Sequence, residues 1–267
     1  DSIAALSDIE MRAGDLDLAD RHAQQQLQRV EARTPAQHPD RIPAMRQRAA
    51  VLNQLGRYGE AQAMLRAAIT MHETVIGDSG ARLADLENDL TVSLNDSGDA
   101  LAALPHAERA MTLTDLSRNS SLDRALILMN LSSTFENAGD YPRAEDLAQQ
   151  SVALYTTEAS SEAEERLRAE GNLARVIGLS GRYDEARARF DSVRSRYALS
   201  GRAGSWPWAF ETYRLAQLER RAGRFDVASA LLDEAEPIFI ASLPELHPAL
   251  AQPHRIRGQI ALAQQRL

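Results

Sequence analysis

Apolar and small residues recur along the chain at helical spacing, in stretches that end at regularly placed glycines. Apolar residues stand eight and four positions before three of these glycines, at Leu90 and Leu94, Leu131 and Phe135, and Leu173 and Ile177. A spacing of four puts both members of a pair on one helical face. The position seven before the glycine is small, at Ala49, Thr91, Ser132, Ala174 and Ala216. The pattern predicts helices that approach a neighbour closely.

Each glycine opens a motif of Gly, a polar residue or Ala, an aromatic or apolar residue, two variable residues and Ala. It begins at Gly14, Gly56, Gly98, Gly139, Gly181 and Gly223, with spacings of 42, 42, 41, 42 and 42 residues. Small or apolar residues follow in helical phase, as at Leu65 and Ala68, Ala107 and Ala110, and Leu232 and Ala235. Such constancy predicts a structural repeat.

The motif has the composition of a turn between two helices. A glycine just past a helix end adopts a left-handed conformation without a Cβ clash, so it can end the first helix. Asp15, Asp99 and Asp140 are placed to cap the second helix, and Pro142 falls in a first turn, where a missing N–H is tolerated. The aromatic residue can wedge between the helices, at Tyr58, Tyr141, Tyr183 and Phe225. Each motif therefore predicts an antiparallel pair of helices.

Helix pairs with an apolar stripe on both sides need a neighbour on both sides. We therefore predict one all-α domain over residues 1–267, a right-handed superhelical solenoid of antiparallel helix pairs. The expected repeats span about 1–37, 38–79, 80–118, 119–160, 161–203 and 204–245, and a closing helix spans 246–267, with Gly258 at its small position. Polar, turn-rich segments at 34–39, 77–80, 117–121, 200–205 and 243–244 read as loops between repeats.

The repeat resembles the tetratricopeptide repeat along the whole chain. The unit of 42 residues is longer than the usual one of ~34. Asn130-Leu131-Ser132 and Asn172-Leu173-Ala174, with His38-Pro39 and His247-Pro248 before the next helix, resemble the kinesin-light-chain type of this family. Arg48, Ala100 and Glu10 depart from the expected apolar or aromatic residues.

Composition and charge narrow the classes of function that the chain can have. The net charge of −8 and pI near 5.3 argue against nucleic acid as a partner. Cysteine is absent, lysine is absent beside 30 arginines, and no apolar run is long enough to cross a membrane. No metal-binding, phosphate-binding or nucleophile motif occurs, and the six histidines are scattered. We therefore expect no catalysis, no cofactor and no membrane insertion by this segment. Because the sequence begins at Asp1, we read it as a piece of a longer protein.

The resemblance implies a ligand groove on the concave surface, lined by the first helix of each pair. Its positions form an acidic, amide-rich zone and a basic zone. The first comprises Asp85, Asn88, Asp89, Asn95, Asp96, Met129, Asn130, Ser133, Glu136 and Asn137, and the second Arg168, Asn172, Arg175, Tyr213, Arg214, Gln217, Arg220, Arg221 and Arg255.

Two interpretations of these residues stay open. The resemblance implies that Asn130 and Asn172 grip a peptide backbone and that Arg168 and Arg214 bind a carboxylate, as an amide and a guanidinium can. Alternatively, the asparagines brace neighbouring helices and the arginines pair with Glu164, Glu170 or Glu211 on the surface.

Trp206, Pro207, Trp208 and Phe210 stand out in a chain with 5% aromatic residues. Tryptophan is enriched at binding hot spots, so these residues could anchor an interface. We favour a plug instead, in which Trp208 and Phe210 pack backward onto the fifth repeat.

The sequence therefore predicts a non-catalytic module that binds a protein or peptide. The resemblance implies an interaction or sensory region of a larger bacterial signalling protein, such as the extracytoplasmic part of a membrane-anchored Ser/Thr kinase. The alternative is a peptide-signal receptor or an assembly scaffold with a closed groove. A homodimer is compatible with either, and the location would be periplasmic beside a membrane kinase and otherwise cytoplasmic.

Overall fold

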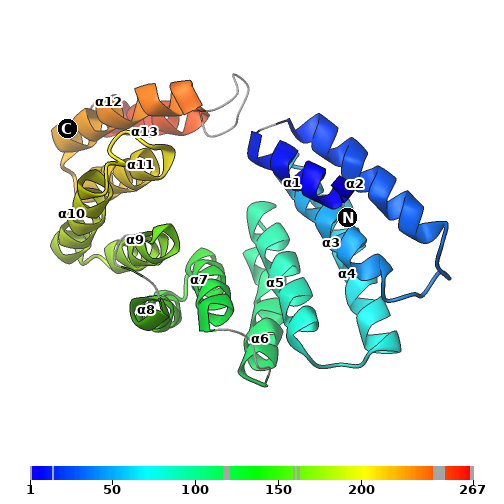
Figure 1. Cartoon of the computed structure of the whole chain (residues 1–267). Helices are drawn as coiled ribbons and strands as arrows, with labels where there is room; N and C mark the ends of the chain where they lie inside the picture. The colour runs from blue at the N-terminus through cyan, green and yellow to red at the C-terminus, as the bar shows by residue number, and fades with distance from the viewer. Residues whose placement is uncertain are drawn as a thin grey trace. The chain divides into compact units, whose positions relative to one another are not determined.

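The computed structural model describes residues 2–13, 15–116, 121–158, 160, 163–242 and 250–264. Within these ranges the chain forms thirteen α-helices and no strand (Figure 1). They are α1 Ser2–Ala13, α2 Leu16–Glu31, α3 Arg41–Gln54, α4 Tyr58–Val75, α5 Ala81–Asp96, α6 Ala100–Leu116, α7 Ser121–Asn137, α8 Tyr141–Glu158, α9 Glu164–Leu179, α10 Tyr183–Leu199, α11 Trp206–Arg221, α12 Phe225–Ser242 and α13 Ala251–Gln264. The predicted all-α helical-repeat fold is confirmed. Gly14, the loop 117–120, Leu243-Pro244 and His247-Pro248 lie outside the described residues.

The turns between paired helices have the predicted chemistry. Gly56, Gly98, Gly139, Gly181 and Gly223 have φ values of 72°, 87°, 84°, 85° and 76°. At the first of these turns the backbone N–H of Arg57 donates to the carbonyl oxygen of Leu52 at 2.8 Å, which satisfies a carbonyl at the end of α3. The Asp15 and Asp99 carboxylates accept from the N–H groups of Leu18 at 3.2 Å and Ala102 at 3.1 Å. The side chains of Asp15 and Asp99 therefore cap their helices, as predicted.

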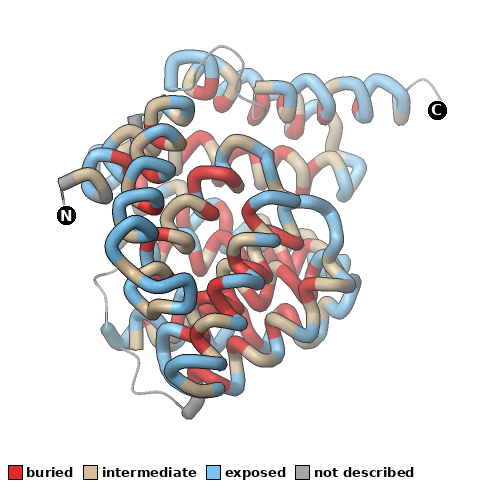
Figure 2. The backbone as a smooth tube through the Cα atoms, turned by 90° about the vertical axis from the view of Figure 1, so that its right-hand side faces the viewer, coloured by how far each residue is buried: buried red, intermediate tan, exposed pale blue. Residues whose placement is uncertain are grey.

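The chain divides into two compact units, each described here by itself. Unit 1, Asp1–Asp140, holds α1 to α7, and unit 2, Tyr141–Leu267, holds α8 to α13. Within each unit a helix packs on the next in sequence, and the first helices of successive pairs also touch, as α3 with α5, α5 with α7, and α9 with α11. Figure 2 shows buried residues returning turn by turn along the helices. Below, helices with odd numbers are called A helices and those with even numbers B helices.

Small residues set how closely the A helices approach. The predicted small positions, Ala49, Thr91, Ser132, Ala174 and Ala216, are all fully buried. The contact between α9 and α11 is closer still at Gly178, because a Cβ there would lie 2.3 Å from Cδ1 of Leu218. The prediction for Gly258 is wrong: it is exposed on α13, with nothing within 4 Å of a Cβ position, because Pro253, Ile256 and Ile260 form the packed face.

Arginines directly after turn glycines tie neighbouring helix pairs together, and two of them use the same position of the preceding pair. The guanidinium of Arg57, directly after Gly56, lies 2.9 Å from a carboxylate oxygen of Asp20 on the preceding B helix. Arg182, directly after Gly181, lies 2.9 Å from Glu145 in the same way. We call these two residues the turn arginines. The sequence pattern shows them only as polar positions, so their role in stacking was not predicted.

Candidate functional site

In unit 1 the asparagines that were predicted to bind a ligand form hydrogen bonds with side chains on the neighbouring A helix. Asn130 of α7 donates from Nδ2 to Oδ1 of Asn88 on α5 at 3.3 Å. Asn95 of α5 donates from Nδ2 to the hydroxyl of Thr134 on α7 at 2.7 Å, while its Oδ1 is buried without a hydrogen-bond partner. These contacts support the bracing interpretation for Asn88, Asn95 and Asn130.

The remaining predicted residues of α7 differ in exposure. Ser133 is half-buried and donates to the carbonyl oxygen of Met129 at 3.4 Å, one turn earlier. Asn137, the last residue of α7, is exposed. Asn137 is therefore the residue of this group with the freest access to solvent.

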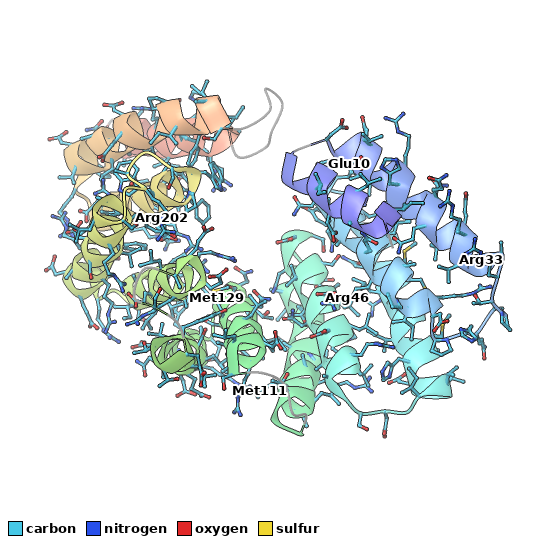
Figure 3. The ribbon with its side chains drawn as sticks, viewed as in Figure 1. Glu10, Arg33, Arg46, Met111, Met129 and Arg202 are labelled. Atoms are coloured by element: carbon cyan, nitrogen blue, oxygen red, sulfur yellow. The ribbon has the colours of Figure 1, made fainter. Side chains whose placement is uncertain are left out.

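The acidic zone of unit 1 is partly neutralised by Arg46, which the sequence analysis did not identify. Arg46 of α3 faces α5, where its Nη1 lies 3.0 Å from Asp85 and its Nε binds Asp89 (Figure 3). Burial raises the pKa of Asp89, and the positive charge of Arg46 opposes that rise. The sequence feature that could have revealed this pair is the separation of Arg46 and Asp89, which is close to the length of one repeat. Asp85 and Asp89, which were predicted to line the ligand groove, are thus already paired with Arg46.

In unit 2, Asn172 and Arg175 of α9 bond to each other. Asn172 is 3% exposed, and its Oδ1 accepts from Nη2 of Arg175 at 2.8 Å. The amide is therefore engaged with its own helix. A ligand would reach the half-buried Arg175 more readily than Asn172.

The carboxylates predicted as surface partners for the arginines divide into two kinds. Glu211 of α11 does pair with Arg214 at 3.2 Å, but it is buried at 1% exposure, so the expectation of a surface pair is wrong here. Its carboxylate lies against Gly171 of α9, where a Cβ would come within 2.3 Å of Oε2. Burial raises the pKa of Glu211, and the charge of Arg214 opposes the rise.

The other two carboxylates are used differently. Glu170 binds Arg166 at 3.1 Å and also Arg196, neither of which was assigned to the groove. Glu164 is exposed in the first turn of α9. Arg214 donates to Glu211, and its guanidinium also lies 4.6 Å from the centre of the Phe210 ring. The charges of Arg175 and Arg168 also oppose the rise in the pKa of Glu211.

Several predicted residues of unit 2 are shown without a side-chain hydrogen bond or ion pair in the described part of the chain. Arg168 of α9 and Arg221 of α11 are exposed, and Gln217 of α11 is half-buried. Tyr213 of α11 is 2% exposed, its ring packs 5.9 Å from that of Phe239, and its hydroxyl has no hydrogen-bond partner. Donors without internal acceptors on α9 and α11 make this A-helix surface the candidate binding site.

The tryptophans at the start of α11 pack inward. Trp208 is 9% exposed, and the guanidinium of Arg194 on α10 lies 4.9 Å from its ring centre. Trp206 packs at 4.6 Å from the ring of Phe239 on α12. Trp208 therefore contacts the fifth repeat as the plug interpretation predicts, whereas Trp206 packs within the sixth.

Several histidines lie in contact with carboxylates. The carboxylate of Glu10 lies 2.8 Å from Nδ1 of His22, which explains how an acid occupies a position where an apolar residue was expected. The carboxylate of Glu87, fully buried on α5, lies 2.7 Å from Nδ1 of His106. Among the described residues there is no group of three or more His, Asp or Glu side chains that could hold a metal ion. No helix in that same part of the chain is long and apolar enough to span a membrane.

Stacked antiparallel helix pairs, with polar A-helix faces and glycine turns, define a helical-repeat protein of the solenoid class. Sequence profiles of the tetratricopeptide repeat match residues 2–74 and 124–159. These two segments therefore match the tetratricopeptide repeat, as the resemblance implied. A search of curated protein sequences found no significant match.

Solved structures share the fold at low sequence identity. A variant of the nearly identical TPR-like repeats of a protein described as a kinesin light chain, from Podosopora anserina, is 20% identical with a TM-score of 0.65, over 77% of this chain and 97% of that one. A Rap protein complexed with competence and sporulation factor is 15% identical with a TM-score of 0.67, over 97% of this chain and 75% of that one. BtubC from P. vanneervenii is 16% identical with a TM-score of 0.61, over 87% and 91%. The predicted kinesin-light-chain-like architecture agrees with these neighbours.

Proposed function

We propose that the chain is a non-catalytic module that binds a protein or peptide segment on its A-helix surface. The observation that carries this proposal is the exposure of Arg168 and Arg221 on α9 and α11, where neither these residues nor Gln217 is shown in a side-chain hydrogen bond within the described residues. Nearly all buried polar groups in proteins find partners, and an exposed arginine without one is available to a ligand. An amide and guanidinium groups on neighbouring helices can bind the backbone and acidic side chains of a polypeptide.

The amide contacts in unit 1 favour unit 2 as the part of the chain that binds the ligand. Asn88, Asn95 and Asn130 bond to partners on the neighbouring A helix, so a ligand would have to compete with those bonds. Arg168 and Arg221 have no side-chain hydrogen bond to give up within the described residues, although the charge of Arg168 also acts on the buried Glu211. Binding through the arginines therefore has the smaller internal cost.

The test uses the full chain as bait for a display library of random peptides. We expect peptides to be enriched, and we expect Arg168→Glu to weaken their binding by about tenfold or more, because it places a negative charge on the surface. The matched control is Arg29→Glu, the same charge change at an exposed residue on the B helix α2. Equal binding by both variants, or no enriched peptide at all, would refute the proposal.

We further propose that the module serves as an interaction or sensory region of a larger bacterial signalling protein. The alternative, a peptide-signal receptor, is favoured by the likeness to the Rap protein solved with competence and sporulation factor, which spans 97% of this chain. The two differ in the ligand they need. Submicromolar affinity for a free peptide of five to ten residues, about as strong as for a longer segment, would support the receptor.

A further inference from the structure

A chain of hydrogen bonds connects the B helices α4 and α6 of unit 1 through a buried carboxylate on the A helix α5. His106 of α6 lies at its centre, with Nδ1 at 2.7 Å from Oε2 of Glu87 on α5 and Nε2 at 3.2 Å from Nη1 of Arg66 on α4. Arg109, one turn later on α6, binds Oε1 of Glu87 at 2.8 Å and also binds Glu73 on α4. Two side chains of the third helix pair, α5 and α6, therefore reach the second pair, α3 and α4.

The partners of His106 determine where its imidazole carries a proton. A guanidinium has only N–H donors, so the Nε2 of His106 must accept from Arg66 and carries no proton. The carboxylate of Glu87 is fully buried and already accepts from Arg109, so it is the acceptor for a proton on Nδ1. When all of these bonds are made, the imidazole is therefore neutral with its proton on Nδ1.

Protonation of the ring breaks one of its two bonds and strengthens the other. A proton on Nε2 turns this atom into a donor on a positively charged ring, which then faces the positively charged donor of Arg66. The bond from Nδ1 to Glu87 becomes a bond between two charged groups and is stronger. Arg66 is exposed and free to turn toward solvent, whereas Glu87 is fully buried and held by Arg109. Proton binding therefore releases α4 and keeps α5 bound to α6.

The other charged groups on the neighbouring helices do not alter this contrast. Within the described residues, His106 is in hydrogen-bond or ion-pair contact with Glu87 and Arg66 only. On α4, Glu73 is bound by Arg109. The charged residues of α7, which also packs on α6, do not bond to His106 and have interactions elsewhere; they are Asp123, Arg124 and Glu136.

We propose that His106 is a pH-sensitive link between the second and third helix pairs, closed when the imidazole is neutral and opened at Arg66 when it is protonated. The contact of Arg109 with Glu73 does not involve His106, so it keeps the two pairs attached while the other end of the link opens. This inference is independent of the proposed function, because it involves no residue of the candidate binding surface.

The test measures how Arg66→Ala changes the urea unfolding of the full chain at pH 8 and at pH 5. These values bracket the range in which histidine ordinarily changes charge. At pH 8 we expect Arg66→Ala to raise the unfolding constant by about two- to tenfold, because the variant removes a hydrogen bond. At pH 5 we expect an unchanged or lowered unfolding constant, because the variant removes a like charge beside the protonated ring.

The matched control repeats this comparison in the variant His106→Gln. A glutamine amide can donate to Glu87 and accept from Arg66, as the neutral imidazole does, but it does not gain a proton in this pH range. In this background Arg66→Ala should raise the unfolding constant equally at both pH values. Effects of the other five histidines are present in both backgrounds and cancel in the comparison.

Nuclear magnetic resonance of the parent chain tests the link without any substitution, and it decides the matter if His106→Gln does not fold. We expect two-bond ¹⁵N–¹H correlations to show the proton of His106 on Nδ1 at pH 8. The side-chain Nε–H signal of Arg66 should shift with the same midpoint as the imidazole. Three results would each overturn the proposal: a proton on Nε2 at pH 8, an equal effect of Arg66→Ala at both pH values in the parent, or a pH-dependent effect in the His106→Gln background.

Discussion

Two buried glutamates on α11 show how one residue type serves opposite roles. Glu219 is fully buried, and its Oε1 lies 2.8 Å from Nε of Arg187, with Arg224 as a second partner. Burial alone would raise the pKa of Glu219, but the hydrogen bonds from these arginines outweigh it and lower the pKa. Glu211 has one paired arginine, and burial raises its pKa. The balance between burial and the hydrogen bonds from arginine therefore sets the direction of each pKa shift.

We predict that Glu219→Gln destabilises the protein by about 1–3 kcal/mol at pH 7, because two arginines lose a charged acceptor. A lowered pKa contributes stability above the ordinary glutamate pKa, and this contribution disappears as the pH falls through the folded-state value. The deficit of the variant should therefore shrink toward pH 3. Urea unfolding followed by circular dichroism across this range measures it, and a deficit independent of pH would contradict the assignment.

Glu211→Gln should behave in the opposite sense. A raised pKa means that the folded state favours the protonated carboxyl, so the parent loses stability as the pH rises from the ordinary value through the folded-state value. Glutamine keeps an acceptor for Arg214 and has no charge to bury. We expect the variant to equal or exceed the parent in stability at pH 7, with a smaller advantage at pH 4, in the same unfolding series. Destabilisation at pH 7 as large as that of Glu219→Gln would show that the carboxylate is needed.

Two helical glycines provide a matched test of close packing. At Gly178 a Cβ would lie 2.3 Å from Leu218, whereas at Gly258 it would meet nothing within 4 Å. We predict that Gly178→Ala costs about 1–3 kcal/mol through overpacking. Gly258→Ala should instead stabilise by about 0.5–1 kcal/mol through helix propensity. Thermal and urea unfolding of both variants measure this, and a shift of the same sign would refute the packing explanation.

At the scale of elements, the turn arginines determine which helix pairs fit side by side. Arg57 and Arg182, each directly after the turn glycine, face Asp20 and Glu145, the sixth residues after the preceding turn glycines. Where the residue after the glycine is Asp99 or Asp140 instead, the corresponding position of the preceding pair is uncharged, at Gln62 or Leu104. At these four turns the charge after the glycine matches the preceding B helix. At Gly223 the sixth position is Arg187, and Arg224 pairs with Asp184 of α10 instead, at 3.1 Å.

We predict a favourable coupling of about 0.2–1 kcal/mol between Arg182 and Glu145. A double-mutant cycle with Arg182→Ala and Glu145→Ala measures it by urea unfolding, and the coupling should fall when NaCl is raised from about 0.05 to 0.5 M. The control cycle pairs Arg182→Ala with Asp191→Ala, an exposed residue on α10 outside this pair. Coupling of equal size in both cycles would mean that the effect is not specific to the bridge.

Local chemistry explains why the helix pairs could be predicted and the site only partly. Gly181 and Tyr183 mark a turn through backbone geometry and helix initiation, which depend on a few adjacent residues. The partners of Arg46 lie on a neighbouring A helix, and Glu211 is buried against Gly171 of another, through packing that periodicity does not describe. Asn130 likewise occupied the expected position but bonded to Asn88.

For the whole molecule, each repeat owes its stability to its neighbours. Leu90 on α5 and Leu232 on α12 are both fully buried, each within its own unit. We predict that Leu90→Ala, at a cost of about 2–5 kcal/mol, lowers amide hydrogen-exchange protection most in α3 to α6. Leu232→Ala should do so most in α10 to α12. Uniform loss of protection across the full chain in either variant would instead indicate a single cooperative unit.

The charge matching at the turns also limits how such an array can lengthen during evolution. A duplicated segment inserted after residue 160 would bring a new Gly-Arg or Gly-Asp turn beside the helix that carries Glu145. Only a copy with arginine after its glycine would regain the bridge, so copies of the second, fifth or sixth segments would be accepted there more readily than copies of the third or fourth. The order of the segments therefore matters, because a random order would place uncharged or like-charged residues opposite some turn arginines.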